Sequence, residues 1–285
     1  MRALLTTFMV CGLLASQAQD AAPGMPISDK GRSAIPETSE APLAAARGVA
    51  AACAPATALR NLEWNSVRAL LENGGSLWYN RSIDKGSYFV PKEGGVSVVY
   101  GGALWMAGIS PDQQLKLAAA RYRTNGNDFW PGPLTNDGSA EVDEATCSAY
   151  DQFSICERQD AMRHRQYFEC SQDPTCDLST EFPQGYSIPT YFFDYPAHGN
   201  VALGQDYYLA PFYDFDGDGN YDPSLGDYPW YDFLQEIDCG NRRREDQVPL
   251  YGDQTYYWIF NDKGNVHTES LGEPIGMEIR AQSFA

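Results

Sequence analysis

Residues 214–222 read Asp-Phe-Asp-Gly-Asp-Gly-Asn-Tyr-Asp, with an aspartate at every second position of the first half. This spacing is typical of an EF-hand-like calcium loop, in which alternate carboxylates converge on one ion when the loop curls. Calcium is a hard cation that binds several oxygen ligands. We therefore expect Asp214, Asp216 and Asp218 to be ligands, with Gly219 at the sharp turn of the loop.

The second half of the loop departs from the EF-hand pattern. Asn220 would offer its backbone carbonyl at position seven, and Asp222 would bind at position nine, directly or through water. Position twelve is Leu225 in place of the bidentate glutamate. We therefore expect Asp227 to complete the coordination shell of the ion, so that the loop spans residues 214–227. The alternative is a solvated acidic turn that holds no ion.

Prolines at positions 211, 223 and 229 surround this loop, so we expect no flanking helices. The sequence thus predicts a structural Ca²⁺ site and not a sensor that opens a groove. Extracellular modules of this kind bind calcium at about 10⁻⁴ to 10⁻³ M.

Signatures of the common enzyme classes are missing. The chain contains no GxSxG, HExxH, P-loop or GxGxxG motif. His164, His198 and His267 are scattered, and we expect each to be a surface or packing residue. A carboxylate pair for glycoside hydrolysis stays open, because the spacing of acids in sequence does not report their spacing in space. The sequence therefore favours a protein without catalysis and leaves enzyme activity undecided.

Aromatic residues in proline-rich segments could form platforms for sugars. Trp130 lies in one such segment, and Tyr228, Trp230 and Tyr231 lie in another, each near acidic residues. The alternative, which we favour, is that these side chains fill the core beneath long loops.

The formal net charge is -18 and the sequence pI is about 4.4. Such a surface repels nucleic-acid phosphates and anionic lipid, so we expect neither as a partner. It suits divalent cations and a saline exterior, although acidity also simply keeps proteins soluble.

Several segments have the patterns of β-strands. Residues 97–106 form an apolar run with a glycine pair at 101–102 that suggests a bulge, and residues 115–122 could pair with it. Residues 254–260 are β-branched and aromatic, and residues 275–282 alternate apolar and polar side chains. Residues 59–71 fit a helix and a strand equally well.

These segments predict a mainly β protein with a β-sandwich-like sheet core and long loop-rich insertions. The insertions fall in residues 124–250, which are rich in Pro, Gly, Asp and Tyr. Long connections of this kind usually need disulfides or metal for stability. The last predicted strand nearly reaches Ala285, which suggests an N-terminal fragment of a longer protein; a native edge strand is the alternative.

Residues 1–18 have the features of a signal peptide. Arg2 precedes an apolar stretch at residues 4–15 that is too short to span a bilayer, and small residues at 16 and 18 predict cleavage after Ala18. The alternative is a buried core helix. Residues 19–58, rich in Ala, Pro, Ser and Gly, are expected to form a flexible leader before a β-rich domain at residues 59–285.

Cleavage would remove Cys11 and leave an even number of cysteines, which favours disulfides in an exported chain. Cys170 and Cys176 bracket a turn-like segment and form the best local pair, followed by Cys147 with Cys156. Cys53 could tether the leader to the domain. Zinc is the alternative, but the chain has no CxxC motif and its histidines do not cluster with thiols.

Segments spread over residues 60–285 together resemble the N-terminal regions of large secreted Bacteroidota proteins that leave the cell through the type IX secretion system. The resemblance rests on residues 73–78 (NGGSLW), 88–91 (YFVP), 101–105 (GGALW), 127–134 (NDFWPGPL), 208–219 (YLAPFYDFDGDG), 226–229 (GDYP) and 252–254 (GDQ). Similar proteins usually carry further β domains and a C-terminal sorting domain; residues 1–285 contain no segment like that sorting domain, so we again expect a fragment of a longer protein. The resemblance implies a cell-surface or released protein, such as an adhesin, and no particular activity.

Two functions follow as expectations. The first is a secreted or cell-surface calcium-binding protein of a structural or adhesive type, without membrane insertion, whose partners are calcium and surface glycans or other extracellular proteins. The second is a carbohydrate-active module, either lectin-like or a glycoside hydrolase.

Overall fold

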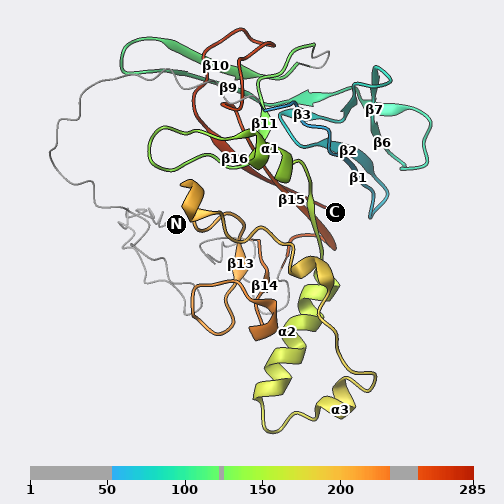
Figure 1. Ribbon diagram of the computed structural model, residues 1–285. Coiled ribbons are helices and arrows are strands. Elements are labelled where there is room, and N and C mark those ends of the chain that lie inside the picture. Colours follow the sequence, from blue (N-terminus) through green and yellow to red (C-terminus); the bar gives the residue numbers. More distant parts are fainter. Residues whose placement is uncertain (1–52, 122–124, 232–249) are drawn as a thin grey trace, which may run out of the picture.

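The structure is a computed structural model that describes residues 53–121, 125–231 and 250–285 (Figure 1). The predicted signal peptide, leader residues 19–52 and Cys239 lie outside these residues. The described residues contain 29% strand and 16% helix. All pairs of named strands are antiparallel. The prediction of a mainly β protein is thus confirmed.

Strand β15 (Gln254–Asn261) lies at the centre of a four-stranded sheet (Figure 1). It pairs with β12 (Ser154–Glu157) and β11 (Trp130–Pro131) along one edge and with β16 (Glu278–Phe284) along the other. The strand predicted at residues 254–260 is therefore confirmed. The alternating segment predicted at 275–282 becomes a strand only from Glu278 onward.

A six-stranded sheet forms the other large β element. Its strands are β1 (Leu59–Leu62), β2 (Arg68–Glu72), β3 (Ser76–Leu77), β6 (Tyr88–Phe89), β7 (Ser97–Val99) and β8 (Gly102–Ala103). β1 and β2 form a hairpin, which decides the ambiguous segment 59–71 in favour of strands.

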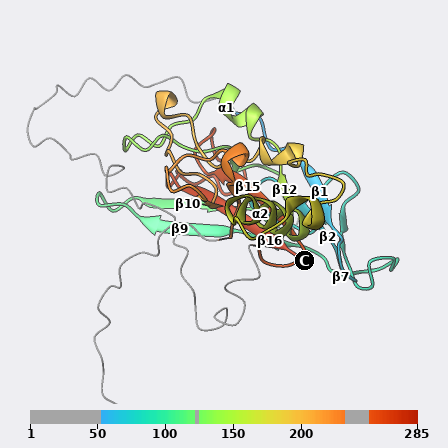
Figure 2. The ribbon, with the colours of Figure 1, turned by 90° about the horizontal axis from the view of Figure 1, so that it is seen from below.

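Three smaller sheets contain two strands each. They are β9 (Trp105–Ile109) with β10 (Leu115–Ala119), β4 (Tyr79–Asn80) with β5 (Lys85–Gly86), and β13 (Phe212–Tyr213) with β14 (Tyr228–Pro229). The β9–β10 pairing confirms the predicted partner of the apolar run, and this hairpin projects from the body of the molecule (Figure 2). The run itself is divided among β7, β8 and β9.

Helices occur within residues 124–250, the region predicted to be rich in loops. They are α1 (Glu144–Ala149), α2 (Arg158–Gln172), α3 (Leu178–Glu181) and the 3-10 turns η2 (Thr190–Phe192), η3 (Val201–Leu203) and η4 (Pro223–Leu225). Helix α2 buries only Ala161, His164 and Cys170, so its apolar stripe is too narrow for a clear helical period. Across the described ranges, no helix combines the length and hydrophobicity that crossing a membrane requires.

The two faces of β15 support two different cores. Tyr256, Trp258 and Phe260 pack with residues of the six-stranded sheet and of β10. Tyr257 and Ile259 point the other way and pack with residues of the loop-rich segment that follows α2. Because side chains alternate along a strand, a single strand thus joins the β half to the loop-rich half.

Two disulfides cross-link the described residues. Cys170 pairs with Cys176, as predicted from the local sequence. The predicted pair of Cys147 with Cys156 is wrong, because Cys147 bonds to Cys53 across a sequence separation of 94 residues. Cys156 lies buried on β12 as a free thiol.

The end of the predicted leader is attached to the domain. Cys53 is buried, and its backbone N–H donates to the Gly264 carbonyl. Further along, Thr57 and Ala58 donate backbone N–H groups to the Asp151 carboxylate. Residues 53–58 are thereby held against the domain that they precede.

We expect the two disulfides to differ in their contribution to stability. Replacing Cys53 and Cys147 together by serine should lower the free energy of unfolding by about 4–5 kcal/mol, because this bond closes a long loop. The matched double serine variant of Cys170 and Cys176 closes a short loop and should lose only about 2 kcal/mol. Urea unfolding of both variants measures the difference, and equal losses would contradict the loop-length argument.

A second prediction concerns Glu72, which is buried beside Arg81 at an N–O distance of 2.7 Å. Burial raises the pKa of this carboxyl from 4.5 to about 6. Between these values the folded state binds more protons than the unfolded state, so the contribution of Glu72 to stability falls as the pH rises. The stability of wild type relative to Glu72→Gln should decline by about 2 kcal/mol between pH 4 and pH 7. Urea titrations of both proteins across this range measure it; a difference independent of pH would contradict it.

Candidate metal site

The aspartate-rich loop is closed at its base by a short sheet. β13 precedes the loop and β14 follows it, and the two strands pair in antiparallel register. Tyr213 and Tyr228, opposite one another in this pair, stack with ring centroids 5.0 Å apart. Residues 214–227 therefore leave and re-enter the body of the molecule at one fixed point.

Asp214 organises the first turn of the loop. Its side chain is buried, and one carboxylate oxygen accepts the backbone N–H of Gly217 at 2.8 Å. The other oxygen accepts the backbone N–H of Gly219, also at 2.8 Å. Gly217 and Gly219 both have positive φ, a conformation that glycine adopts without strain. These contacts curl the chain around the Asp214 carboxylate.

The curl brings three carboxylates together. Asp214, Asp216 and Asp218 each offer an oxygen that lies within 4.8 Å of the other two, and the side chains of Asp216 and Asp218 are exposed. The group could hold a metal ion. This outcome agrees with the sequence argument that alternate positions of a curled loop face the same point.

The other three predicted ligands have different local contacts. Asn220 accepts a hydrogen bond from the Tyr207 hydroxyl at its side-chain oxygen. Asp222 caps η4 by accepting the Ser224 backbone N–H. Asp227 is buried, and its two oxygens accept the backbone N–H groups of Phe215 and Asp222, both at 2.7 Å. Asp227 thus braces the two ends of the loop against each other.

Residues from an earlier segment support the loop from outside. His198 Nε2 lies 2.8 Å from the backbone nitrogen of Tyr221 and Nδ1 lies 3.1 Å from the Tyr207 carbonyl oxygen. An imidazole protonated on Nδ1 satisfies both contacts, because Nε2 then accepts and Nδ1 donates. The His198 ring stacks on Tyr207 at 4.0 Å, and the Tyr208 hydroxyl donates to the Gly219 carbonyl.

The environment sets the acidities of these carboxyls. Burial raises the pKa of Asp214, and it raises the pKa of Asp227 to about 7. The exposed Asp218 has a lowered pKa because its carboxylate accepts hydrogen bonds from Asn220. A bound divalent cation would favour the ionised form of any carboxyl that contacts it.

The aromatic residues considered as sugar platforms lie in the core. Trp130, Tyr228 and Trp230 are all buried, which confirms the packing interpretation for them, and Tyr231 is half-buried and packs against the same core as Trp230. His164 and His267 are also buried: His164 contacts the Tyr186 hydroxyl, and His267 lies between two backbone carbonyls. These side chains serve packing and not an open site.

Sequence reasoning missed the supporting residues His198, Tyr207 and Tyr208, because nothing in their own spacing links them to a loop that begins several residues later. It also missed a groove beside Trp64, whose walls come from three distant parts of the chain. A lone tryptophan next to Asn65 gives no periodic signal, although the Asx-type contact of Asn65 with the Val67 N–H marks a turn.

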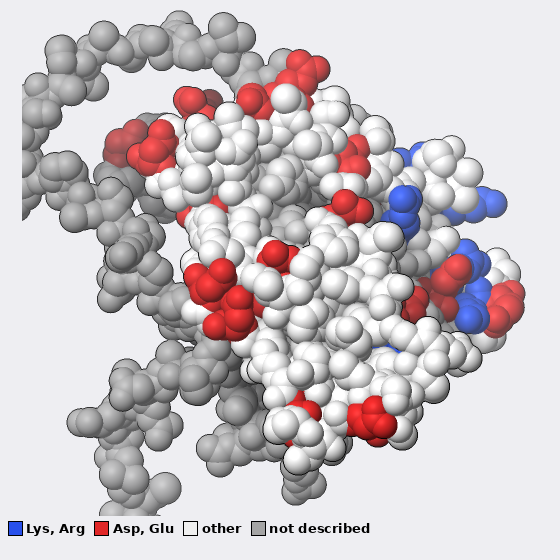
Figure 3. Space-filling view, turned by 60° about the horizontal axis from the view of Figure 1, so that its bottom comes forward, with Lys and Arg blue, Asp and Glu red and all other residues white. Residues whose placement is uncertain are grey.

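Charge is unevenly distributed over the surface. Figure 3 shows acidic side chains at several points of one face, whereas the basic side chains visible there gather along one side.

Searches against family models, curated proteins and solved structures return no match for this chain.

We expect Asp227 to stabilise the loop in the absence of any metal. Asp227→Ala would leave two backbone N–H groups near the loop base without their acceptor, which should cost roughly 3 kcal/mol of unfolding free energy. Asp137→Ala is the matched control, because Asp137 also accepts hydrogen bonds from its neighbours but is exposed, and it should cost less than about 1 kcal/mol. Urea unfolding in EDTA measures both; similar losses would refute the bracing role.

Proposed function

We propose that this chain is a secreted or cell-surface calcium-binding protein of a structural or adhesive type that performs no catalysis. The observation that carries the proposal is the group formed by Asp214, Asp216 and Asp218 on a loop that the backbone has already curled. Three converging carboxylates with neighbouring carbonyls match the oxygen-rich coordination that Ca²⁺ prefers. Asn220, Asp222 and Asp227 are the proposed remaining contributors, Asn220 through its backbone carbonyl and Asp222 directly or through water.

The role proposed for the ion is to stiffen a part of the fold with little regular structure. Between helix α2 and β15 the described chain has short helices and turns, and only β13 and β14 pair there as named strands. An ion bound to this loop would join carboxylates that otherwise repel one another. The six-stranded and four-stranded sheets are proposed to form the sandwich-like core that such a loop-rich half requires, and their shared apolar cluster supports this arrangement.

Export and attachment to other extracellular molecules complete the proposal. Two disulfides support an oxidising location, since such bonds are rare in the cytosol. The β9–β10 hairpin supports an adhesive role, because Trp105, Ile109 and Leu115 are large, apolar and exposed on it. The resemblance to type IX secretion substrates points to the same class of protein. Nucleic acid and the membrane interior are not among the proposed partners.

The second candidate, a carbohydrate-active module, no longer has support from Trp130 or Trp230, which lie in the core. A lectin-like activity would need another surface. Catalysis by a carboxylate pair has no specific observation in its favour.

Calcium should raise the melting temperature. With a dissociation constant of about 10⁻⁴ to 10⁻³ M, 10 mM CaCl₂ should stabilise the fold by roughly 1–3 kcal/mol, or about 3–10 °C. Thermal melts in CaCl₂, in MgCl₂ and in EDTA measure the effect. Calcium should act more strongly than magnesium, because the smaller ion demands near-octahedral geometry and loses water reluctantly.

The control for this experiment is a pair of double variants with equal charge changes. Asp216→Asn with Asp218→Asn should abolish the calcium shift while each amide oxygen can still accept the local backbone N–H. Asp137→Asn with Asp173→Asn changes two exposed aspartates that make the same kind of local contact, and it should keep the full shift. A wild-type protein that does not respond to calcium, or two variants that respond equally, would refute the calcium site.

A further inference from the structure

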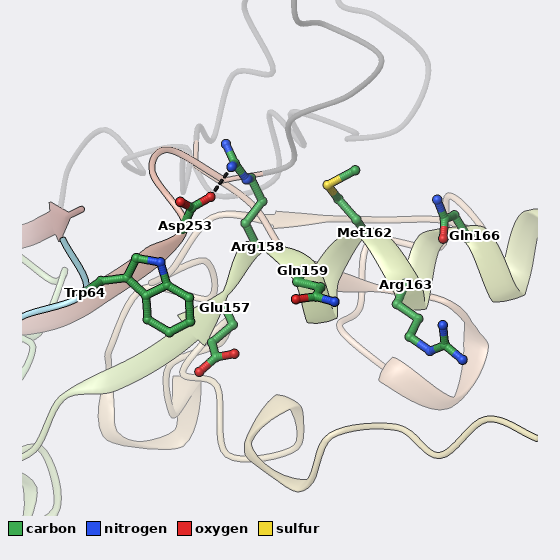
Figure 4. A pocket seen from close by; sticks show the side chains of 8 residues that line it. All are labelled: Trp64, Glu157, Arg158, Gln159, Met162, Arg163, Gln166 and Asp253. Carbon is green, nitrogen blue, oxygen red and sulfur yellow. Dashed lines mark hydrogen bonds and ion pairs between the residues drawn. The ribbon is translucent and has the colours of Figure 1, made fainter. Parts of the chain in front are cut away.

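An open groove of about 490 Å³ lies between the β1–β2 turn and the first half of helix α2 (Figure 4). Its volume falls in the range of roughly 300–1,000 Å³ that is usual for small-molecule sites. Trp64 stands at one end, and Arg163 and Gln166 stand at the other. The groove is remote in sequence from the aspartate-rich loop, and the two share no residue.

The walls of this groove are attached to the same strand. Glu157 ends β12 and pairs with Gln254 at the start of β15. Arg158 donates its backbone N–H to the Asp253 carbonyl and forms an ion pair with the Asp253 carboxylate. On the other side, the Tyr256 hydroxyl donates to the Asn61 carbonyl and ties the β1–β2 hairpin to β15. The described walls of the groove are therefore held in place by contacts with β15 and with Asp253 just before it.

Trp64 offers an exposed indole face to the groove. The residue is 46% exposed, and the Asn65 side chain fixes the turn that carries it by accepting the Val67 backbone N–H. The face of an indole carries negative quadrupolar charge, which attracts the weakly positive C–H groups on the flat side of a pyranose ring. A large aromatic surface left in water at a groove is also unfavourable unless a ligand covers it.

Polar side chains along the groove are available to a ligand. Gln159, Arg163 and Gln166 lie on one face of α2 because they are three or four residues apart, and the Arg163 guanidinium also lies over the Phe182 ring, 4.8 Å from its centroid. Within the described ranges, no hydrogen bond engages the side chains of Glu157, Gln159 or Gln166. Carboxylate, amide and guanidinium groups together supply the donors and acceptors that sugar hydroxyls, which both donate and accept, can satisfy.

The charges of the groove are balanced. Its lining contains two carboxylates, Glu157 and Asp253, and two guanidinium groups, Arg158 and Arg163, whereas the whole chain carries a formal net charge of -18. A balanced lining on an acidic protein favours a neutral ligand over an anion or a cation.

From these features we infer that the groove beside Trp64 binds a neutral oligosaccharide, with one sugar ring stacked on the indole and its hydroxyls bonded to side chains of Glu157 and α2. The site gives the surface protein a glycan ligand, and it needs neither the calcium loop nor the ion proposed there.

A panel of neutral tetrasaccharides (cellotetraose, maltotetraose, chitotetraose and mannotetraose) tests the inference by isothermal titration calorimetry with the whole chain, in EDTA and in 10 mM CaCl₂. At least one should bind in both buffers, and trigalacturonate should bind at least tenfold more weakly. Binding in EDTA separates this site from the calcium loop. The absence of binding by every neutral sugar, or equal or tighter binding of trigalacturonate, would overturn the inference.

Two tryptophan variants provide the matched comparison. Trp64→Ala should weaken the binding of that tetrasaccharide at least tenfold, and Glu157→Gln should weaken it by a smaller factor. Trp105→Ala also removes an exposed tryptophan, 69% exposed on the β9–β10 hairpin, and should leave the affinity unchanged. Circular dichroism and melting temperature show whether each variant is folded. A folded Trp64→Ala protein that binds like wild type, or an equal loss in Trp105→Ala, would contradict the site.

Discussion

The fold depends on one strand, β15, whose two faces are both buried. Strands that separate core from water expose every second side chain, but β15 has apolar neighbours on each side. Its backbone pairs along both edges, so it cannot shift register without moving an entire set of aromatic side chains. Both candidate sites are fixed with respect to this strand, the groove through β12 and Asp253 and the aspartate-rich loop through the core beneath it.

Away from β15, buried carboxylates take the place of regular hydrogen-bond ladders. Asp262 accepts the backbone N–H groups of Ile275, Gly276 and Met277, and Asp128 accepts those of Glu269 and Ser270. Asp214 and Asp227 do the same in the aspartate-rich loop. Such contacts satisfy backbone donors in segments that form neither helix nor sheet. Part of the acidity of this chain is thus a structural device for ordering irregular backbone, whereas Asp216 and Asp218 have exposed side chains.

The local patterns in the sequence were sufficient for the strands at 254–260 and 115–119 and for the convergence of Asp214, Asp216 and Asp218. Those features depend on residue types that recur at every second position, a pattern that is visible within a few residues. Helix α2 was missed because its sequence is mostly polar, and the Cys53–Cys147 bond was missed because its partners are 94 residues apart. The role of Asp227 as a backbone brace depends on which N–H groups face it. The groove at Trp64 likewise exists only once β1, β12 and α2 are packed together.

The Cys53–Cys147 bond also determines how tension would travel through the molecule. A pull on the chain ahead of Cys53 crosses the sulfur bridge directly to helix α1, which contains Cys147. The covalent path thus bypasses the ninety-odd residues inside that ring, including the whole six-stranded sheet and the β9–β10 hairpin. Tension reaches these residues only through their noncovalent contacts with the segment that follows α1, such as the Tyr256–Asn61 hydrogen bond.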